Sequence, residues 1–123
     1  MKRSELKELI FNTFGHLDYF QLLGLTGYAE ARGEPKEGII AVMSVILERV
    51  DHRDWDGKTI REVCLMPYQF SCYLPDDDQF PALRLIAGNW EEKYLKSIDL
   101  KQCYRIAVDL INGLIPRQTE IEK

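Results

Sequence analysis

A single glutamate stands out as a group that could do acid chemistry. Glu30 lies in the segment Gly27-Tyr28-Ala29-Glu30-Ala31-Arg32-Gly33-Glu34-Pro35, whose glycine and proline indicate the end of one helix and the start of the next. There, the negative end of the helix dipole and a partly dry pocket between Ala29 and Ala31 favour the protonated carboxyl. Such an acid can protonate the departing oxygen of a glycosidic bond. The alternative is a solvated surface residue, the usual state of a lone glutamate.

Two other groups of residues carry side chains that can bind metal ions. The three cysteines, Cys64, Cys72 and Cys103, are an odd number, and we expect reduced thiols. A zinc site built from Cys64, Cys72 and His52 is conceivable, but no ligand pair has the close spacing of known sites. The run Asp76-Asp77-Asp78 predicts a solvated turn, because calcium needs more oxygen ligands at alternating positions. We therefore predict no metal and no cofactor.

Composition narrows the class of protein. The chain has 123 residues, a formal charge of −4, 46% apolar residues and 29% charged residues, which fits one soluble globular domain. Acidic and basic residues alternate without a basic face, so nucleic acid is not an expected partner. No stretch is apolar enough to span a membrane. The first residues, 1–7, lack the apolar region of a signal peptide.

The sequence predicts that all the elements that position Glu30 are helices. Helical periodicity predicts an all-α fold, or α with minimal β, with helices over 4–15, 18–33, 35–50, 59–65, 82–94 and 99–112. The third helix is apolar almost all round, which predicts that it is the central one. Gly24 and Gly27 indicate close helix packing or a bend. Residues 51–57 should be a polar loop, 68–72 an irregular segment, 74–78 a surface turn and 116–123 a polar tail.

Two separated motifs resemble one known family. The first is Tyr28-Ala29-Glu30-Ala31-Arg32-Gly33-Glu34-Pro35-x-Glu37-Gly38, followed by Ala41-Val42 and Ile46-Leu47-Glu48-Arg49-Val50. The second is Pro67-x-Gln69-Phe70-Ser71-Cys72. In this order and spacing they resemble the SleB-type cell-wall hydrolases, also called spore-cortex-lytic enzymes, over roughly residues 20 to 115.

The resemblance implies a lysozyme-like catalytic domain related to lytic transglycosylases. Such an enzyme cuts peptidoglycan between N-acetylmuramic acid and N-acetylglucosamine, and the family's catalytic glutamate corresponds to Glu30. It would first protonate the glycosidic oxygen and then accept a proton from the muramic acid C6 hydroxyl, closing a 1,6-anhydro ring. The candidate substrate-binding residues are Tyr28, Gln69, Phe70 and Ser71.

One departure from the family pattern affects the groove that would bind the glycan strand. The family continues with a Gly-Ala-Thr-His-like segment and a later Gly-Asn-His-like segment, where this chain has 113–120 instead. We therefore expect a single catalytic domain over 1–123 that lacks the family's C-terminal segment. The missing export signal suits a bacteriophage lysin, cytoplasmic until its release to the wall or carried in a virion. We expect a monomer whose partner is the peptidoglycan glycan strand.

Three functions other than that of a lytic transglycosylase are also compatible with the sequence. A hydrolytic muramidase would use water and a second carboxylate, with Glu34 or Glu37 as candidates. A peptidoglycan-binding module would keep the fold without the chemistry. An all-α interaction domain would bury Phe70, Trp55 and Trp90 against a partner, although that leaves the joint presence of the two motifs unexplained.

Overall fold

The computed structural model describes residues 1–52 and 59–118, and within them the chain is helical with no β-strand. This confirms the all-α prediction and agrees with a lysozyme-like helical domain. In chain order the elements are α1 (Arg3–Phe14), α2 (Tyr19–Ala31), α3 (Lys36–Asp51), α4 (Ile60–Leu65), the 3-10 turn η1 (Ser71–Tyr73), α5 (Phe80–Gly88), α6 (Trp90–Lys96) and α7 (Ile98–Ile111). No helix in these ranges is both long enough and apolar enough to cross a membrane.

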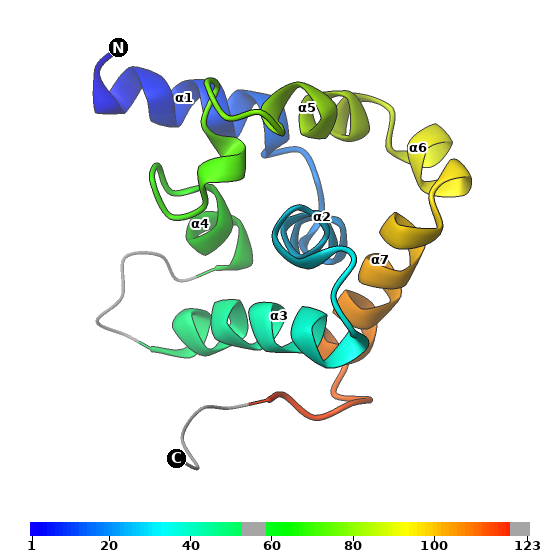
Figure 1. Ribbon diagram of the computed structural model, residues 1–123. Coiled ribbons are helices and arrows are strands. Elements are labelled where there is room, and N and C mark those ends of the chain that lie inside the picture. The colour runs from blue at the N-terminus through cyan, green and yellow to red at the C-terminus, as the bar shows by residue number, and fades with distance from the viewer. Residues whose placement is uncertain (53–58, 119–123) are drawn as a thin grey trace.

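The central helix is α2, and the prediction that the following helix is central was wrong. Figure 1 shows α2 near the middle of the fold, with α3, α4 and α7 around it. Every residue of α2 from Leu22 to Gly27 is buried. In α3, by contrast, Val45 is 40% exposed, so part of its apolar surface faces solvent. Apolar residues all round a helix show only that it can be buried, because the packing of other elements decides which faces are covered.

Glycines bring α2 close to its neighbours, as predicted for Gly24 and Gly27. A Cβ atom on Gly24 would lie 3.0 Å from the Tyr104 Cα, so the backbones of α2 and α7 pack directly against each other. A Cβ atom on Gly27 would lie 2.4 Å from the Met43 Cε in α3. These two close contacts hold α2 between α3 and α7.

Two predicted helix starts are confirmed by capping side chains, and two others differ from the prediction. The Asp18 carboxylate accepts from the Gln21 backbone N–H at 2.7 Å, and the Thr59 hydroxyl accepts from that of Glu62. The first helix begins at Arg3 rather than Ser4. The last helix begins at Ile98, capped by the Ser97 hydroxyl rather than by Asp99.

The helix predicted over 82–94 is two helices, α5 and α6. The chain breaks at Asn89, whose φ of −143° and ψ of 51° are not helical. Gly88 precedes it and lowers the cost of leaving the helix. Trp90 and Tyr94 still stack one turn apart in α6, with ring centroids 6.2 Å apart.

The segment after α7 turns back along α3. Gly113 has a φ of +73°, which ends α7 as predicted. Arg117 then forms ion pairs with Glu48 and Asp51, and the Gln118 backbone N–H donates to the Ser44 hydroxyl at 2.9 Å. The described part of the predicted polar tail is therefore bound to α3. Trp55 and most of the predicted 51–57 loop lie outside the described residues.

Candidate active site

Glu30 lies in the last turn of α2, as the sequence predicted, and is the second-to-last residue of that helix. The helix ends at Arg32, whose ψ of 142° is extended, and a turn follows in which Gly33 has a φ of +89° and the Glu34 backbone N–H donates to the Ala31 carbonyl at 3.0 Å. The predicted dry surrounding of Glu30 was wrong, because its side chain is exposed and only Ala31 beside it is buried. The carboxylate is therefore open to a large ligand approaching from solvent.

The face of α2 that carries Glu30 binds the second motif. Thr26 and Glu30 are four residues apart and so share one face of the helix. The Thr26 hydroxyl is hydrogen-bonded to the Tyr73 hydroxyl at 2.7 Å, and the Cys72 thiol lies close enough to Glu30 for that carboxylate to raise the pKa of the thiol. Two consecutive residues of η1 thus lie against two consecutive turns of α2. The fold thereby brings together the two motifs that the sequence separates by about 40 residues.

The cysteines are buried thiols inside this arrangement. Burial raises the pKa of Cys72, and the negative charges of Glu30 and Asp77 add to that increase. Burial also raises the pKa of Cys64 to about 12 and that of Cys103 to about 11. Among residues 1–52 and 59–118, no group of three metal-ligating side chains is close enough to hold a metal ion. Each thiol stays neutral near neutral pH, and a neutral Cys72 thiol can donate to the neighbouring carboxylate.

Gln69 is held in place by α3. The Arg49 Nη1 donates to the Gln69 Oε1 at 2.9 Å, and the Gln69 side chain is half-buried. The amide oxygen is thus engaged by the protein, and the amide nitrogen is the end that can donate to a ligand. Sequence reasoning missed Arg49 as a site residue, although it lies in the quoted Ile46-Leu47-Glu48-Arg49-Val50 segment. Its position in the last turn of α3 gave no indication of its partner.

The remaining residues of the second motif divide between packing and exposure. Phe70 is half-buried and packs against the hydrophobic core. Ser71 is exposed at the start of η1, where its carbonyl accepts from the Leu74 backbone N–H at 2.9 Å. The contacts of Phe70 are those of a packing residue, whereas the hydroxyl of Ser71 is accessible to a ligand.

Tyr28 lies on the other side of α2 from Glu30. Residues two apart in a helix do not face each other. The Arg32 guanidinium lies over the Tyr28 ring, 4.5 Å from its centroid. Arg32 also donates to the Tyr28 carbonyl at 3.3 Å, which caps this helix end, and to the Gln79 Oε1 at 3.1 Å. Tyr28 therefore supports the end of α2, and a role in binding substrate stays a prediction.

Other carboxylates lie near the site. The Glu34 side chain lies over the first turn of α3, where a Cβ on Gly38 would be 3.4 Å from its Oε1, and a negative charge favours that helix end. Asp77 belongs to the predicted surface turn, and its Oδ1 accepts from the Gln79 backbone N–H at 2.9 Å. Its negative charge raises the pKa of the Cys72 thiol, which lies beside Glu30. Asp77 was missed as a site residue because the acidic run suggested only solvation.

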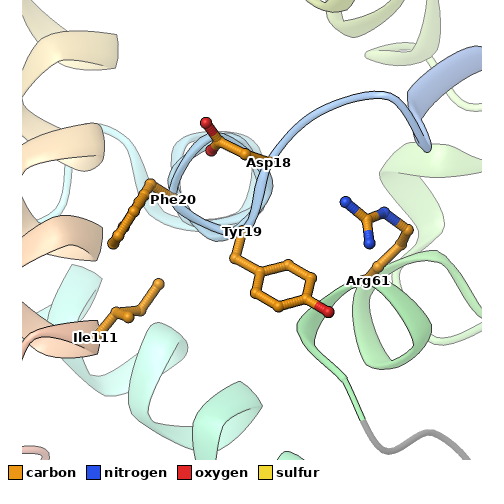
Figure 2. Close-up of a pocket in the computed structure, with 5 residues that line it drawn as sticks. All are labelled: Asp18, Tyr19, Phe20, Arg61 and Ile111. Carbon is orange, nitrogen blue, oxygen red and sulfur yellow. The ribbon is translucent and has the colours of Figure 1, made fainter.

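A cavity of about 360 Å³ lies at the opposite end of α2 from Glu30. Figure 2 shows it between Asp18, Tyr19 and Phe20 at the start of α2, Arg61 of α4 and Ile111 of α7. Both charged groups already have protein partners. Arg61 donates to the carbonyls of Gly15 and Leu17, and Asp18 caps α2. We therefore interpret this cavity as a feature of helix packing that lies apart from the candidate active site.

Comparison with known proteins identifies the family. A model of the Cell Wall Hydrolase family matches residues 33–121, which is more than half of the chain. The chain therefore belongs to the cell wall hydrolase family, an enzyme class that degrades peptidoglycan, as the SleB-type resemblance predicted. No curated protein and no solved structure matches the chain. The family match includes Gln69, Phe70 and Ser71 and begins three residues after Glu30, so it does not itself assign Glu30.

Proposed function

We propose that the chain is a lytic transglycosylase in which Glu30 acts alone, first as acid and then as base. The observation that carries the proposal is the packing of η1 on α2, where Thr26 hydrogen-bonds to Tyr73 and Cys72 lies beside Glu30. It sets Glu30, an exposed carboxylate of the first motif, beside the second motif, which is the arrangement that acid catalysis on a bound glycan requires.

The proposed reaction takes place at the bond between N-acetylmuramic acid and N-acetylglucosamine. The Glu30 carboxyl donates its proton to the bridging oxygen as the bond from that oxygen to muramic acid C1 breaks, and N-acetylglucosamine leaves with a free hydroxyl. The C6 hydroxyl oxygen of the same muramic acid then bonds to C1, and its proton passes to Glu30. The carboxyl is protonated again, the product carries a 1,6-anhydro ring, and no water is consumed.

In this proposal the other residues position the substrate. The Gln69 amide nitrogen and the Ser71 hydroxyl donate to polar groups of the sugars, and the Cys72 thiol fixes the direction of the Glu30 carboxylate. The monomeric state, the single-domain organisation and the cytoplasmic location before release stay predictions.

Digestion of purified sacculi with mass analysis of the soluble products tests the proposal. Wild type should release anhydro-muropeptides, and Glu30→Gln should lower the rate by about 10²–10⁴-fold, the usual contribution of general acid–base catalysis. Glu91→Gln, which changes an exposed carboxylate of α6, is the matched control and should keep the wild-type rate. Unchanged turnover by Glu30→Gln would contradict the proposal, and binding without release of fragments would favour a non-catalytic module.

A hydrolytic muramidase is the second candidate, and Asp77 is the observation in its favour. Its charge acts on the same thiol that contacts Glu30, so a second carboxylate lies near the site. Asp77→Asn keeps the oxygen that caps the Gln79 N–H and removes only the charge. Products with reducing ends, together with loss of activity in Asp77→Asn, would establish hydrolysis. Anhydro products and a normal rate in that variant are expected if Glu30 acts alone.

A further inference from the structure

Tyr68, the unspecified position of the second motif, has a backbone conformation that tyrosine rarely adopts. Its φ is +71°, and it is the only non-glycine residue in the described ranges with positive φ. The Gln69 backbone N–H donates to the Met66 carbonyl at 3.1 Å, which closes a turn with Pro67 and Tyr68 at its centre. Proline followed by a residue of positive φ is the pattern of a type II turn, whose second central position normally holds glycine.

The Tyr68 side chain does not compensate for this strain within the protein. It is 67% exposed, whereas Pro67 before it is buried. Within residues 1–52 and 59–118, its hydroxyl makes no hydrogen bond and its ring joins none of the aromatic or cation–π contacts. A large exposed ring in a strained conformation is a reason to look for function, because neither burial nor a local partner accounts for it.

The position of Tyr68 connects it to the Glu30 site. The next residue is Gln69, which Arg49 holds at 2.9 Å. Tyr68 is four residues before Cys72, so the Cα atoms of the two residues can be at most about 14 Å apart. The turn is therefore anchored on both sides, by the buried Pro67 and by the Arg49–Gln69 hydrogen bond, and it places Tyr68 inside the second motif, next to Gln69.

We propose that Tyr68 is a substrate-positioning residue that stacks on a sugar ring of the glycan strand bound at the Glu30 site. A sugar presents C–H groups on its faces and hydroxyls on its rim, and tyrosine offers a flat apolar ring with a polar hydroxyl at one edge. The inference deepens the proposed function and rests on it for the identity of the ligand. The stacking contact is remote from the bond that breaks, so Tyr68 contributes to KM more than to kcat.

The test is equilibrium binding to purified sacculi in a Glu30→Gln background, which avoids digestion. Tyr68→Gly removes the ring and relieves the backbone, and Tyr68→Phe keeps the ring. Leu114→Gly is the matched control, because it removes another exposed apolar side chain, one that is 70% exposed beyond α7. Tyr68→Gly should bind about three- to tenfold more weakly, the range of an aromatic stacking contact, and the other two variants should bind like the parent. Its melting temperature should equal or exceed that of the parent.

Each outcome decides the inference separately from the proposed function. Parental binding by Tyr68→Gly, a lower melting temperature in that variant, or equal weakening by Leu114→Gly would overturn the role of Tyr68. If wild type releases anhydro-muropeptides and Tyr68→Gly has an unchanged KM, the stacking role fails while the transglycosylase proposal stands. If wild type releases nothing but Tyr68→Gly alone binds sacculi more weakly, the stacking role stands while the proposed reaction fails.

Discussion

The Arg49 guanidinium in α3 donates a 2.9 Å hydrogen bond to the side-chain oxygen of Gln69, twenty residues further along the chain. This contact fixes the amide by its oxygen and directs its N–H donors to the other side. A residue that only supported the fold would need no more than an acceptor for Arg49. A residue that also binds substrate needs the donors as well.

Replacing Gln69 by glutamate separates these two roles. Gln69→Glu keeps an acceptor for Arg49 and adds an opposite charge, so the free energy of unfolding should be unchanged or slightly higher. It removes both N–H donors, so kcat/KM on sacculi should fall roughly 5- to 100-fold, as for a polar group left without its partner at about 1–3 kcal/mol. Gln102→Glu adds the same charge at an exposed position of α7 and should have no effect. Wild-type activity in a stable Gln69→Glu protein would show that Gln69 is structural only.

Alanine in place of Gly24 should destabilise the fold, although alanine is the better helix former. The new Cβ would meet the Tyr104 Cα at 3.0 Å, and backbone cannot move aside as a side chain can. We expect a loss of about 1–3 kcal/mol, the usual cost of overpacking, in urea unfolding. Gly27→Ala meets only the flexible end of Met43 and should cost less. Gly88→Ala, with no atom within 4 Å of the added carbon, is the control, and equal effects at all three positions would refute the steric explanation.

The hydrogen bond between Thr26 and Tyr73 should show an asymmetric response to mutation. Thr26→Val leaves the buried Tyr73 hydroxyl without its partner, which should cost about 1–3 kcal/mol of unfolding free energy. Tyr73→Phe should cost about 0.5–1.5 kcal/mol, because the Thr26 hydroxyl keeps its 2.8 Å bond to the Leu22 carbonyl. Chemical denaturation of both variants measures the difference. Since η1 is attached to α2 here, activity should fall more in Thr26→Val, and a larger loss in Tyr73→Phe would contradict this explanation.

The parts of the fold that could be predicted are those with local signals. Asp18 with Gln21, and Thr59 with Glu62, are capping pairs whose geometry depends on a few neighbouring residues, so both helix starts were predicted correctly. The last helix was predicted to begin at Asp99, but it begins at Ile98 and is capped by Ser97. The centrality of α2 depends on how distant elements pack, and no periodicity within one helix contains that information.

In the candidate site, too, the features with local signals could be predicted and those created by packing could not. Glu30 at a helix end and the second motif were both visible in the sequence, because each is a local pattern. The contacts of Cys72 with Glu30 and of Gln69 with Arg49 join residues far apart in the chain, and only the packing of α2, α3 and η1 creates them. The exposure of Glu30 was predicted wrongly, because small neighbours do not bury a side chain unless another element covers it.

Alkaline pH should destabilise the protein through its buried thiols. The Cys64 pKa is raised by burial from 9.0 to about 12, so above pH 9 the unfolded thiol loses its proton while the folded thiol keeps it. The stability that this contributes is fully present below pH 9 and is lost as pH rises toward 12. Cys103, with a pKa of about 11, acts in the same direction. Urea unfolding between pH 8 and 10.5 should show a fall of up to about 1.4 kcal/mol per pH unit from Cys64.

The variant Cys64→Ala identifies the source of this slope. It lowers stability at every pH because it removes a buried side chain, but its unfolding free energy should decline less steeply above pH 9 than that of wild type. Thiol labelling gives an independent measure, since the folded protein at pH 8 should react only as fast as it unfolds. An unchanged slope in Cys64→Ala, or labelling of Cys64 in the folded protein at the rate of a free thiol, would show that this thiol is accessible and that another group causes the alkaline loss.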